Sequence, residues 1–483
     1  MANTRRQFIK QAGAGLMGSG FIGNSVFATN KHVETTKTLT NHSSTKEKLT
    51  LKVKKPIFCP YHSLETNVDG HWGGWHYYRN DAFTHNPFTI QASGMSGSPV
   101  IVDAVGKFVG FTNNYAYQDA TFSFDGLETL TINVPKGQEV FIDESGNGDQ
   151  AWRNYNALML QRLGISTIKG HPEFWADVEY CTWVEQKKQS TKPLQHFNLL
   201  THGFVKTYIK NIKALGYPLG KLTLDHGWGQ FPDGSVKSGF GSWIPDSEKF
   251  PDFKGTMHMI QDNGFTPGLW IGFPKIQKES IIAKQQPNLL GSWNVGDTDK
   301  DTSAVRYLNP MGDIYGYASE TIGRFYDMGV KKFKIDMSYN SKSDMIYIHK
   351  ELYRAAKDID TNIEMEFHVP DIFFAKYADV IRTNDVWLID KFDWQSRVET
   401  HYKVAHQSAC GKGINLDHIG GNASENLTEK QFLKHLDMYN GKTGYPLVSL
   451  LPSRVSNKCV EKTGDYLWDY HKNGRNIMST YFN

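Results

Sequence analysis

Cysteine is scarce in this sequence, and its placement excludes two common kinds of site. The 483 residues include only four cysteines, Cys59, Cys181, Cys410 and Cys459, and none of them forms a Cys-x-x-Cys pair. Such spacing provides neither a zinc-binding signature nor a dithiol redox signature. One or two disulfides remain open if the protein occupies an oxidising compartment.

The sequence also lacks a strong net charge and a long apolar segment. It has 53 Lys and Arg against 50 Asp and Glu, a formal net charge of +3, which argues against nucleic acid or an anionic membrane as the main partner. No segment approaches the ~18 consecutive apolar residues that a membrane-spanning helix needs. A His-Glu-x-x-His motif and a glycine-rich phosphate loop are absent, so we expect no metal and no other cofactor.

Aromatic residues, in contrast, are abundant. They make up 13% of the sequence and include 12 Trp. Indole and phenol rings suit carbohydrate because a flat apolar face covers the C–H face of a pyranose while the ring edge stays polar. Most of these rings fill a large core, yet their number makes a saccharide a ligand class to consider.

The N-terminus has the layout of an export signal. Arg5 and Arg6 precede a Gly/Ala-rich apolar run that ends at Ala28, and this layout resembles a twin-arginine signal peptide. We therefore expect residues 1–28 to direct a bacterial protein, already folded, to the periplasm or outside the cell. Residues 29–52 have no Phe, Trp or Tyr and are rich in Thr, Lys, Asn and Ser, which predicts a disordered linker.

Two folded domains are predicted from a change in hydrophobic period. Residues 53–148 contain short β-branched and aromatic runs between turn dipeptides, which is typical of a small antiparallel β-sandwich domain. From Asp149 a helical period of about 3.6 residues begins, and strands then alternate with helices over residues 149–483. Eight strand ends lie at 180–183, 222–225, 269–271, 333–336, 363–366, 380–382, 414–417 and 447–450. Eight units favour closure into a (β/α)8 TIM barrel, so the expected fold class is α/β.

Chemically active side chains cluster at these strand ends, where β/α barrels carry their active sites. The strand that buries Phe333 and Ile335 would present Lys334 and Asp336 there. The full set comprises Trp183, Asp225, Trp228, Trp270, Lys334, Asp336, Glu366, Arg382, Asp385 and Asp417. A single Asp at a strand end commonly caps the next helix. The convergence of the whole set on one face favours a site for a polyhydroxylated neutral ligand.

The same motifs carry a resemblance to a known group of enzymes. The chain resembles the α-galactosidases of glycoside hydrolase families 36 and 27 through Trp183 with Glu185, Asp225-His226-Gly227-Trp228, Gly268-Leu269-Trp270, Lys334-Ile335-Asp336 and Thr383-Asn384-Asp385. A further stretch, Asp417-His418-Ile419-Gly420-Gly421, is similar to the Asp-Ile-Gly-Gly motif of the related family 31 α-glucosidases and α-xylosidases. The resemblance covers about residues 149–454.

This resemblance implies a retaining mechanism in which Asp336 is the nucleophile and Asp385 the general acid/base. It also implies roles in substrate binding: Asp225, Lys334 and Arg382 at the sugar hydroxyls, Trp183 and Trp270 at the pocket floor, Trp228 and Asp417 on the same rim, and Glu366 behind them.

Two departures from the family pattern concern the sugar. His226 replaces the second Asp of Asp-Asp-Gly-Trp, and the segment around His368 stands where family 36 has Cys-x-Gly-Gly. A histidine donor at either place would suit an anionic, sulfated or anhydro sugar; the alternative is that each imidazole only packs.

We therefore expect an exported retaining α-glycoside hydrolase, similar to an α-galactosidase, that removes a terminal sugar, with or without a modification, from an oligo- or polysaccharide. Two alternatives stay open. One is an α-glucosidase-like or α-xylosidase-like hydrolase, or a transglycosidase; the other is a non-catalytic carbohydrate-binding barrel. The expected partner is the saccharide, with no nucleic acid and no membrane span. The sequence leaves the oligomeric state undefined.

Overall fold

The computed structural model describes most of the chain between residues 35 and 475. The described residues are 35–38, 46–55, 57–58, 60–62, 75–77, 88–91 and 100–475, with gaps at 166–170, 193, 232–238, 295–296, 302, 339–340, 370, 384, 390–393, 409–410 and 423–426. The expected signal peptide, residues 1–28, lies outside them. No helix in the described part of the chain is both long and apolar enough to cross a membrane.

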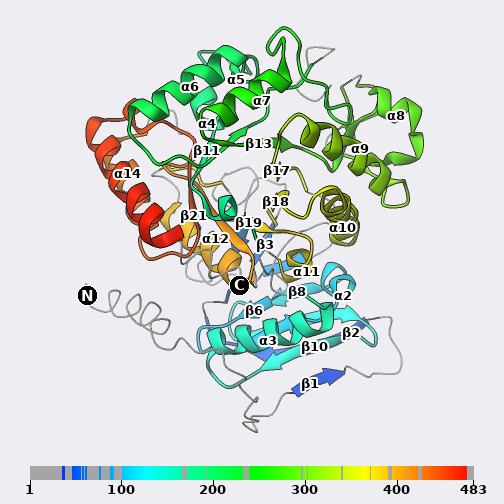
Figure 1. Ribbon diagram of the computed structural model, residues 1–483. Helices are drawn as coiled ribbons and strands as arrows, with labels where there is room; N and C mark the ends of the chain where they lie inside the picture. The colour runs from blue at the N-terminus through cyan, green and yellow to red at the C-terminus, as the bar shows by residue number, and fades with distance from the viewer. Residues whose placement is uncertain are drawn as a thin grey trace.

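The N-terminal domain is a sandwich of two antiparallel four-stranded sheets, drawn in blue and cyan in Figure 1. One sheet has the order β1 (Thr35–Thr38), β10 (Glu139–Asp143), β7 (Phe108–Phe111), β6 (Val100–Val102), and the other β2 (Lys46–Lys52), β9 (Thr129–Pro135), β8 (Thr121–Phe124), β5 (Phe88–Gln91). Alternate residues of β9, Leu130, Ile132 and Val134, enter the core that both sheets share. The predicted antiparallel sandwich is confirmed.

Two strands lie in the range for which we expected a disordered linker, residues 29–52. Strand β2 pairs with β9 along its whole length and buries Leu49 and Leu51 in the sandwich core. The expectation is therefore wrong for residues 46–52, and also for residues 35–38, which form β1 and pair with β10. A strand with period-2 alternation needs no aromatic residue to bury one face once a partner strand supplies the opposite wall.

Helix α3 (Gly148–Leu163) connects the two domains. Its Trp152 and Tyr155 pack on the sandwich strands, and Ile372 and Phe373 of the barrel domain complete the same apolar cluster. Figure 1 shows the helix lying along the sheet below the barrel. The helix that we counted as the start of the barrel domain thus packs on the sandwich, and the first barrel strand follows only at β11.

The C-terminal domain is a closed barrel of eight strands whose neighbouring pairs are parallel. The strands are β11 (Glu179–Cys181), β12 (Lys221–Leu224), β13 (Thr266–Ile271), β17 (Lys332–Ile335), β18 (Glu364–Phe367), β19 (Val380–Arg382), β20 (Gly413–His418) and β21 (Tyr445–Val448). Each of them falls at a strand that the sequence predicted, and the (β/α)8 TIM barrel is confirmed.

Helices surround this barrel (Figure 1). They are α4 (Trp183–Gln189), α5 (His196–Leu199), α6 (His202–Ala214), α7 (Phe253–Asp262), α8 (Ile281–Gln285), α9 (Ile314–Asp327), α10 (Lys342–Ile359), α11 (Ile372–Ala375), α12 (Trp394–Ser408), α13 (Glu429–Asp437) and α14 (Asn457–Asp469). The smaller elements are α2 (Asn114–Gln118), the pair β3 (Pro60–His62) and β4 (Trp75–Tyr77), and the sheet of β14 (Lys275–Gln277), β16 (Val305–Leu308) and β15 (Leu290–Trp293).

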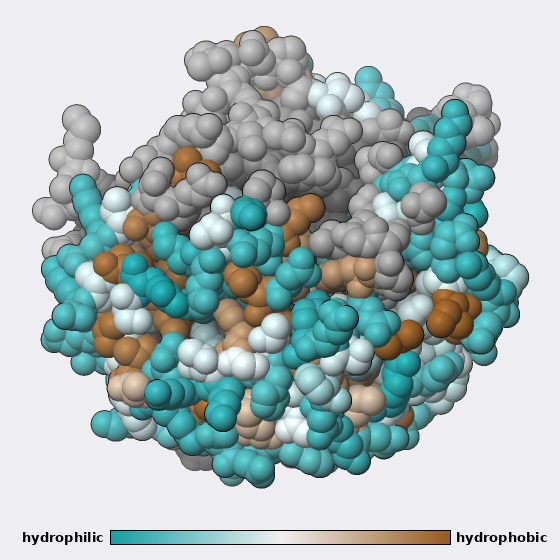
Figure 2. Space-filling view, turned by 90° about the horizontal axis from the view of Figure 1, so that it is seen from above, coloured by the Kyte–Doolittle hydropathy of each residue, from teal (hydrophilic) through white to brown (hydrophobic). Residues whose placement is uncertain are grey.

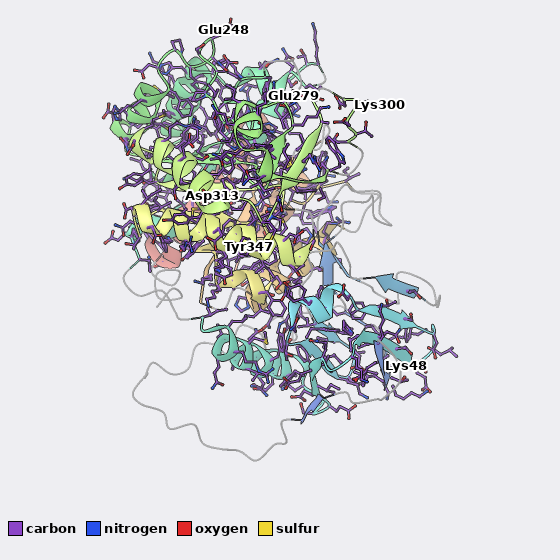
Figure 3. The ribbon with its side chains drawn as sticks, turned by 90° about the vertical axis from the view of Figure 1, so that its right-hand side faces the viewer. Lys48, Glu248, Glu279, Lys300, Asp313 and Tyr347 are labelled. Atoms are coloured by element: carbon purple, nitrogen blue, oxygen red, sulfur yellow. The ribbon has the colours of Figure 1, made fainter. Side chains whose placement is uncertain are left out.

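One face of the molecule is largely hydrophilic where it is described. In Figure 2 the described part of the upper face is mostly teal, with small brown areas between. Figure 3 shows Lys48 on the sandwich and Glu248 at the opposite end of the molecule, on the barrel, with Asp313 of the α9 cap and Tyr347 of α10 between them.

The barrel interior is ionic rather than aliphatic. Strand β17 alternates, so that Phe333 and Ile335 join the apolar core while Lys332 and Lys334 point into the barrel. The ammonium of Lys332 forms ion pairs with Glu179 and, at 2.6 Å, with Glu366. We call the fully buried group Glu179, Lys221, Lys332, Glu364, Glu366, Asn415 and Tyr445 the ionic layer.

Removal of one cation from this layer should destabilise the protein strongly. Lys332→Met leaves Glu179 and Glu366 buried without their shared cation, and we expect the free energy of unfolding to fall by about 3–5 kcal/mol. Urea unfolding at pH 7 measures it. Lys462→Met, which breaks an exposed pair with Asp465 on α14, should cost less than about 1 kcal/mol. Equal losses would contradict the role of the ionic layer.

Candidate active site

Asp336 stands directly after β17, at the carboxyl end of the fourth barrel strand. Its Oδ2 accepts a hydrogen bond from Trp270 Nε1 at 3.1 Å, and its Oδ1 accepts one from the amide of Met337 at 2.7 Å. Met337 has a φ of 67°, a left-handed conformation that is unfavourable for a residue with a side chain. A strained backbone of this kind persists only where surrounding contacts hold it. Here it directs the backbone N–H of Met337 toward the Asp336 carboxylate.

Positive and polar groups surround the Asp336 carboxylate. Arg382 lies 3.7 Å from its Oδ2, and His368 Nδ1 lies 3.4 Å from its Oδ1. Burial alone would raise its pKa, but His368, Arg382 and Lys334 outweigh burial and hold the pKa of Asp336 well below its usual range. Asp336 is therefore ionised at neutral pH, and its side chain keeps 20% of its surface exposed, which leaves it accessible to a ligand.

Lys334 and Asp225 form the floor beside this carboxylate. Lys334 Nζ lies 2.8 Å from Asp225 Oδ2, and the Cys181 thiol donates to the same oxygen at 3.1 Å. The amide of His226 donates to the other oxygen of Asp225 at 2.8 Å. Both charged side chains are almost fully buried, so this pair lies below the more exposed Asp336.

Asp385 follows β19, the sixth barrel strand, and is held by two donors. Arg382 lies 3.3 Å from its Oδ1, and the side-chain Nδ2 of Asn422 donates a hydrogen bond to its Oδ2 at 2.7 Å. The carboxyl keeps 32% of its surface exposed. Burial would raise its pKa, yet Arg382 and His418 outweigh burial and lower the pKa of Asp385.

Asp417 and His418 lie behind Asp385. His418 Nε2 is 3.3 Å from Asp417 Oδ1 and 3.5 Å from Asp385 Oδ1, and Arg382 is 3.7 Å from Asp417 Oδ2. Burial together with the charge of Asp385 raises the pKa of Asp417 to about 8, although Arg382 opposes the rise. Burial lowers the pKa of His418 to about 3, so the imidazole is neutral at pH 7. Asp385, Asp417 and His418 together therefore keep one proton at neutral pH, and Asp417 holds it.

Asp385, Asp417 and His418 bring three potential metal ligands within 4.8 Å of one another. The guanidinium of Arg382 is already placed 3.3 Å from Asp385 and 3.7 Å from Asp417. A bound cation would meet this positive charge at close range, so the arrangement fits an arginine-neutralised carboxyl pair better than a metal site.

One residue expected on the rim, Trp228, is placed elsewhere, and Glu366 lies behind the other residues, as expected. Trp228 is 1% exposed, packs against Phe253 and Phe325, and donates Nε1 to the carbonyl of Trp270, so it supports the barrel wall from outside. Glu366 belongs to the ionic layer beneath the pocket, where Tyr445 donates to it at 2.8 Å. Neither reaches the rim. Strand-end position alone does not reveal which way an indole turns, and Glu366 lies a full layer below Asp336.

The other expected residues lie around Asp336 and Asp385. Trp270 donates to Asp336 and stacks on His226, with ring centroids 4.3 Å apart. Trp183 donates to Asn422 at 3.1 Å on the Asp385 side. Of the two histidines that depart from the family pattern, His226 therefore lies beside Trp270, and His368 contacts the Asp336 carboxylate directly.

Sequence reasoning missed Asn422. It follows Gly420 and Gly421, and both glycines have positive φ. A Cβ on Gly421 would lie 2.7 Å from Leu388 and 2.8 Å from the carbonyl of Val386, so the turn requires glycine. The sequence signal for Asn422 was the pair Gly420-Gly421, because a turn at these glycines returns the chain toward the loop that carries Asp385.

The fold and these carboxylates together define a class of β/α barrel with a paired-acid pocket at the carboxyl ends of its strands. No family model matches the sequence, and no curated protein matches it. Solved structures do match. The chain is similar to the α-galactosidase TtGalA from Thermus thermophilus bound to p-nitrophenyl α-D-galactopyranoside, with a TM-score of 0.59, 12% identity and 88% of each chain covered.

Two further structures extend this likeness. A family 31 α-xylosidase from a soil metagenome has a TM-score of 0.62 at 10% identity, over 90% of this chain and 67% of its own. The family 36 α-galactosidase AgaB from Geobacillus stearothermophilus has a TM-score of 0.56 at 14% identity, over 89% and 62%. The resemblance to families 36 and 31 is confirmed at the level of the fold.

The shared proton can be observed directly. We expect one aspartate carboxyl to titrate with a pKa of about 8 in ¹³C NMR of protein labelled at the aspartate side-chain carbons, and its resonance to be missing in Asp417→Asn. Asn tolerates the left-handed φ of 66° at this position, so the variant should fold. If every aspartate titrated in the acidic range, the proton would not reside on Asp417.

Proposed function

We propose that the protein is an exported retaining α-glycoside hydrolase, similar to an α-galactosidase, that releases a terminal sugar from an oligo- or polysaccharide. The observation that carries this proposal is the pair Asp336 and Asp385, which stand on the ends of the fourth and sixth barrel strands and share the guanidinium of Arg382. Asp336 is held ionised, and Asp385 has a proton source, Asp417, beside it.

The first chemical step forms a glycosyl-enzyme. An oxygen of ionised Asp336 attacks the anomeric carbon while the bond from that carbon to the glycosidic oxygen breaks. Asp385 gives its proton to the departing oxygen, and Arg382 is freed to balance the new carboxylate. The proton on Asp417, within reach of Asp385 beside His418, supplies Asp385 for this step.

The second step regenerates the protein. Asp385, now ionised, takes a proton from a water molecule, whose oxygen attacks the anomeric carbon as the bond to Asp336 breaks. Two inversions return the sugar with its original α configuration. Lys334 and Asp225 at the floor, with Trp270 on the wall, provide the donors, acceptor and apolar surface that bind a pyranose.

A galactose-type sugar is favoured by the likeness to α-galactosidases, and the likeness to an α-xylosidase supports a glucose- or xylose-type sugar as the second candidate. Galactose differs from glucose in the configuration of the hydroxyl at C4, and xylose lacks the CH2OH group that both hexoses carry at C5. A panel of aryl α-galactosides, α-glucosides and α-xylosides therefore decides between them, and a sugar acceptor at high concentration reveals any transglycosylation.

Asp336→Asn should lower kcat/KM on the hydrolysed aryl α-glycoside by at least about a thousandfold, because the amide is no nucleophile. Asp336→Ala with added azide should instead form the β-configured glycosyl azide, since azide enters from the face that the carboxylate occupied. The exposed Asp465→Asn on α14 serves as the matched control. Near-parent turnover by the Asp336→Asn protein would remove the nucleophile assignment.

Export through the twin-arginine route is the remaining part of the proposal and rests on Arg5 and Arg6 of residues 1–28. Replacement of both arginines by lysine should retain the protein in the cytoplasm of a bacterium that possesses this pathway. Equal amounts in the periplasmic fraction with and without the replacements would argue for another route.

A further inference from the structure

Lys187 of helix α4 lies next to the general acid/base. Its Nζ donates to Asn422 Oδ1 at 3.2 Å, and the amide nitrogen of Asn422 donates to Asp385 Oδ2 at 2.7 Å. A positive charge is thus one side chain away from the carboxyl that protonates the glycosidic oxygen. The mechanism described above makes no use of this charge.

Two indoles frame the Lys187 ammonium. Its Nζ lies 4.2 Å from the ring centroid of Trp387, which belongs to the Asp385 loop, and 5.5 Å from that of Trp183. The lysine is half-buried. Among the residues that the structure describes, its contacts are these two rings and one amide oxygen, and none of them is a carboxylate.

Lys187 brings a positive charge to this side of the site, where the charge of Asp385 acts on it. His196, which lies edge-on to Trp183, is neutral at pH 7 because burial lowers its pKa to about 4. Asp385 is shared with Arg382 and with Asn422. Burial lowers the pKa of Lys187, and the nearby charge of Asp385 opposes this effect. Among the described residues no carboxylate forms an ion pair with the half-buried ammonium, so an anionic ligand would bring a closer counter-ion.

The reaction determines which part of the substrate occupies this place. Asp385 protonates the oxygen of the leaving group, so the leaving sugar must lie beside Asp385, on the side of Lys187 and Trp387. We propose that Lys187 binds an anionic substituent, a sulfate ester or a carboxylate, on the leaving sugar, while the neutral ring of that sugar packs on Trp387 or Trp183. This inference rests on the proposed function and names the class of its substrate.

A purely positioning role is the competing explanation. Lys187 could serve only to orient Asn422 and, through it, Asp385. In that case its removal would slow neutral and anionic substrates by the same factor. A binding role predicts instead a change in the ratio between them, expressed mainly in KM.

The kinetic test compares 4-nitrophenyl α-D-galactopyranoside with the same galactoside carrying a carboxylate on the aryl ring. We expect Lys187→Gln to lower the anionic-to-neutral ratio of kcat/KM by about tenfold. Lys187→Arg keeps the charge and should retain most of the ratio. Lys188→Gln removes a charge from the exposed neighbour on the same helix and should leave the ratio unchanged. An equal loss on both substrates in Lys187→Gln would overturn the binding role.

A second measurement does not depend on turnover. Isothermal titration calorimetry measures the binding of three α-linked galactose disaccharides to protein that carries Asp336→Asn. In one disaccharide the reducing-end sugar is sulfated, in the second it is a uronic acid, and in the third it is unmodified. We expect about tenfold tighter binding of one anionic form, and we expect it to disappear when Lys187→Gln is added. The tighter of the two anionic forms identifies the substituent.

The two measurements separate the two ways of failing. Absence of hydrolysis of every aryl glycoside contradicts the proposed function, and the titration still decides whether Lys187 selects an anion. Hydrolysis of the neutral galactoside, with equal affinity for all three disaccharides, contradicts the anionic substituent and leaves the glycosidase proposal standing.

Discussion

The electrostatic balance around Arg382 is the constraint on which the site depends. One guanidinium faces Asp336, Asp385 and Asp417, at 3.7, 3.3 and 3.7 Å. The neighbouring cation Lys334 is already paired with Asp225. One positive charge cannot keep three crowded carboxylates ionised, so a proton remains among them. The arrangement leaves Asp336 ionised and places the proton on Asp417, next to Asp385. This is the distribution of charge that a double displacement needs at its start.

This balance relies on the ionic layer beneath it. Many barrels of this type fill their interior with Val, Ile and Leu. Here Lys332 pairs with Glu179 and Glu366, and Asn415 donates to both of these carboxylates. Buried ion pairs carry a desolvation cost, and they add little net stability over apolar packing. They do hold their partners in one arrangement, and Glu366 in turn helps to fix the charges of Lys334 and Arg382 above it.

The sequence predicted the architecture because barrel strands carry a local signal. Buried strands such as the one around Phe333 and Ile335 are short apolar runs between helices of clear period, and this pattern needs no long-range information. The same reasoning was wrong for residues 46–52. Whether an alternating polar segment becomes a strand depends on the partner β9, which lies far along the chain.

The site was predicted less completely than the fold. Asp336, Asp385 and Arg382 were expected to lie together because strand ends meet at one edge of a barrel, and the structure brings them together. Trp228 and Glu366 sit at strand ends too, but the direction and depth of a side chain depend on packing between elements. Asn422 and Lys187 were not identified, because Lys187, Asn422 and Asp385 belong to three separate βα units and come together only in the folded barrel.

Covalent trapping tests the central claim most directly. A ring-fluorinated α-galactosyl fluoride carries an excellent leaving group, yet its fluorine slows hydrolysis of the glycosyl-enzyme, so the intermediate accumulates. The account predicts that the protein becomes labelled once per chain and that peptide mass spectrometry places the sugar on Asp336. A label on another carboxylate, or slow turnover with inverted product and no label, would contradict it.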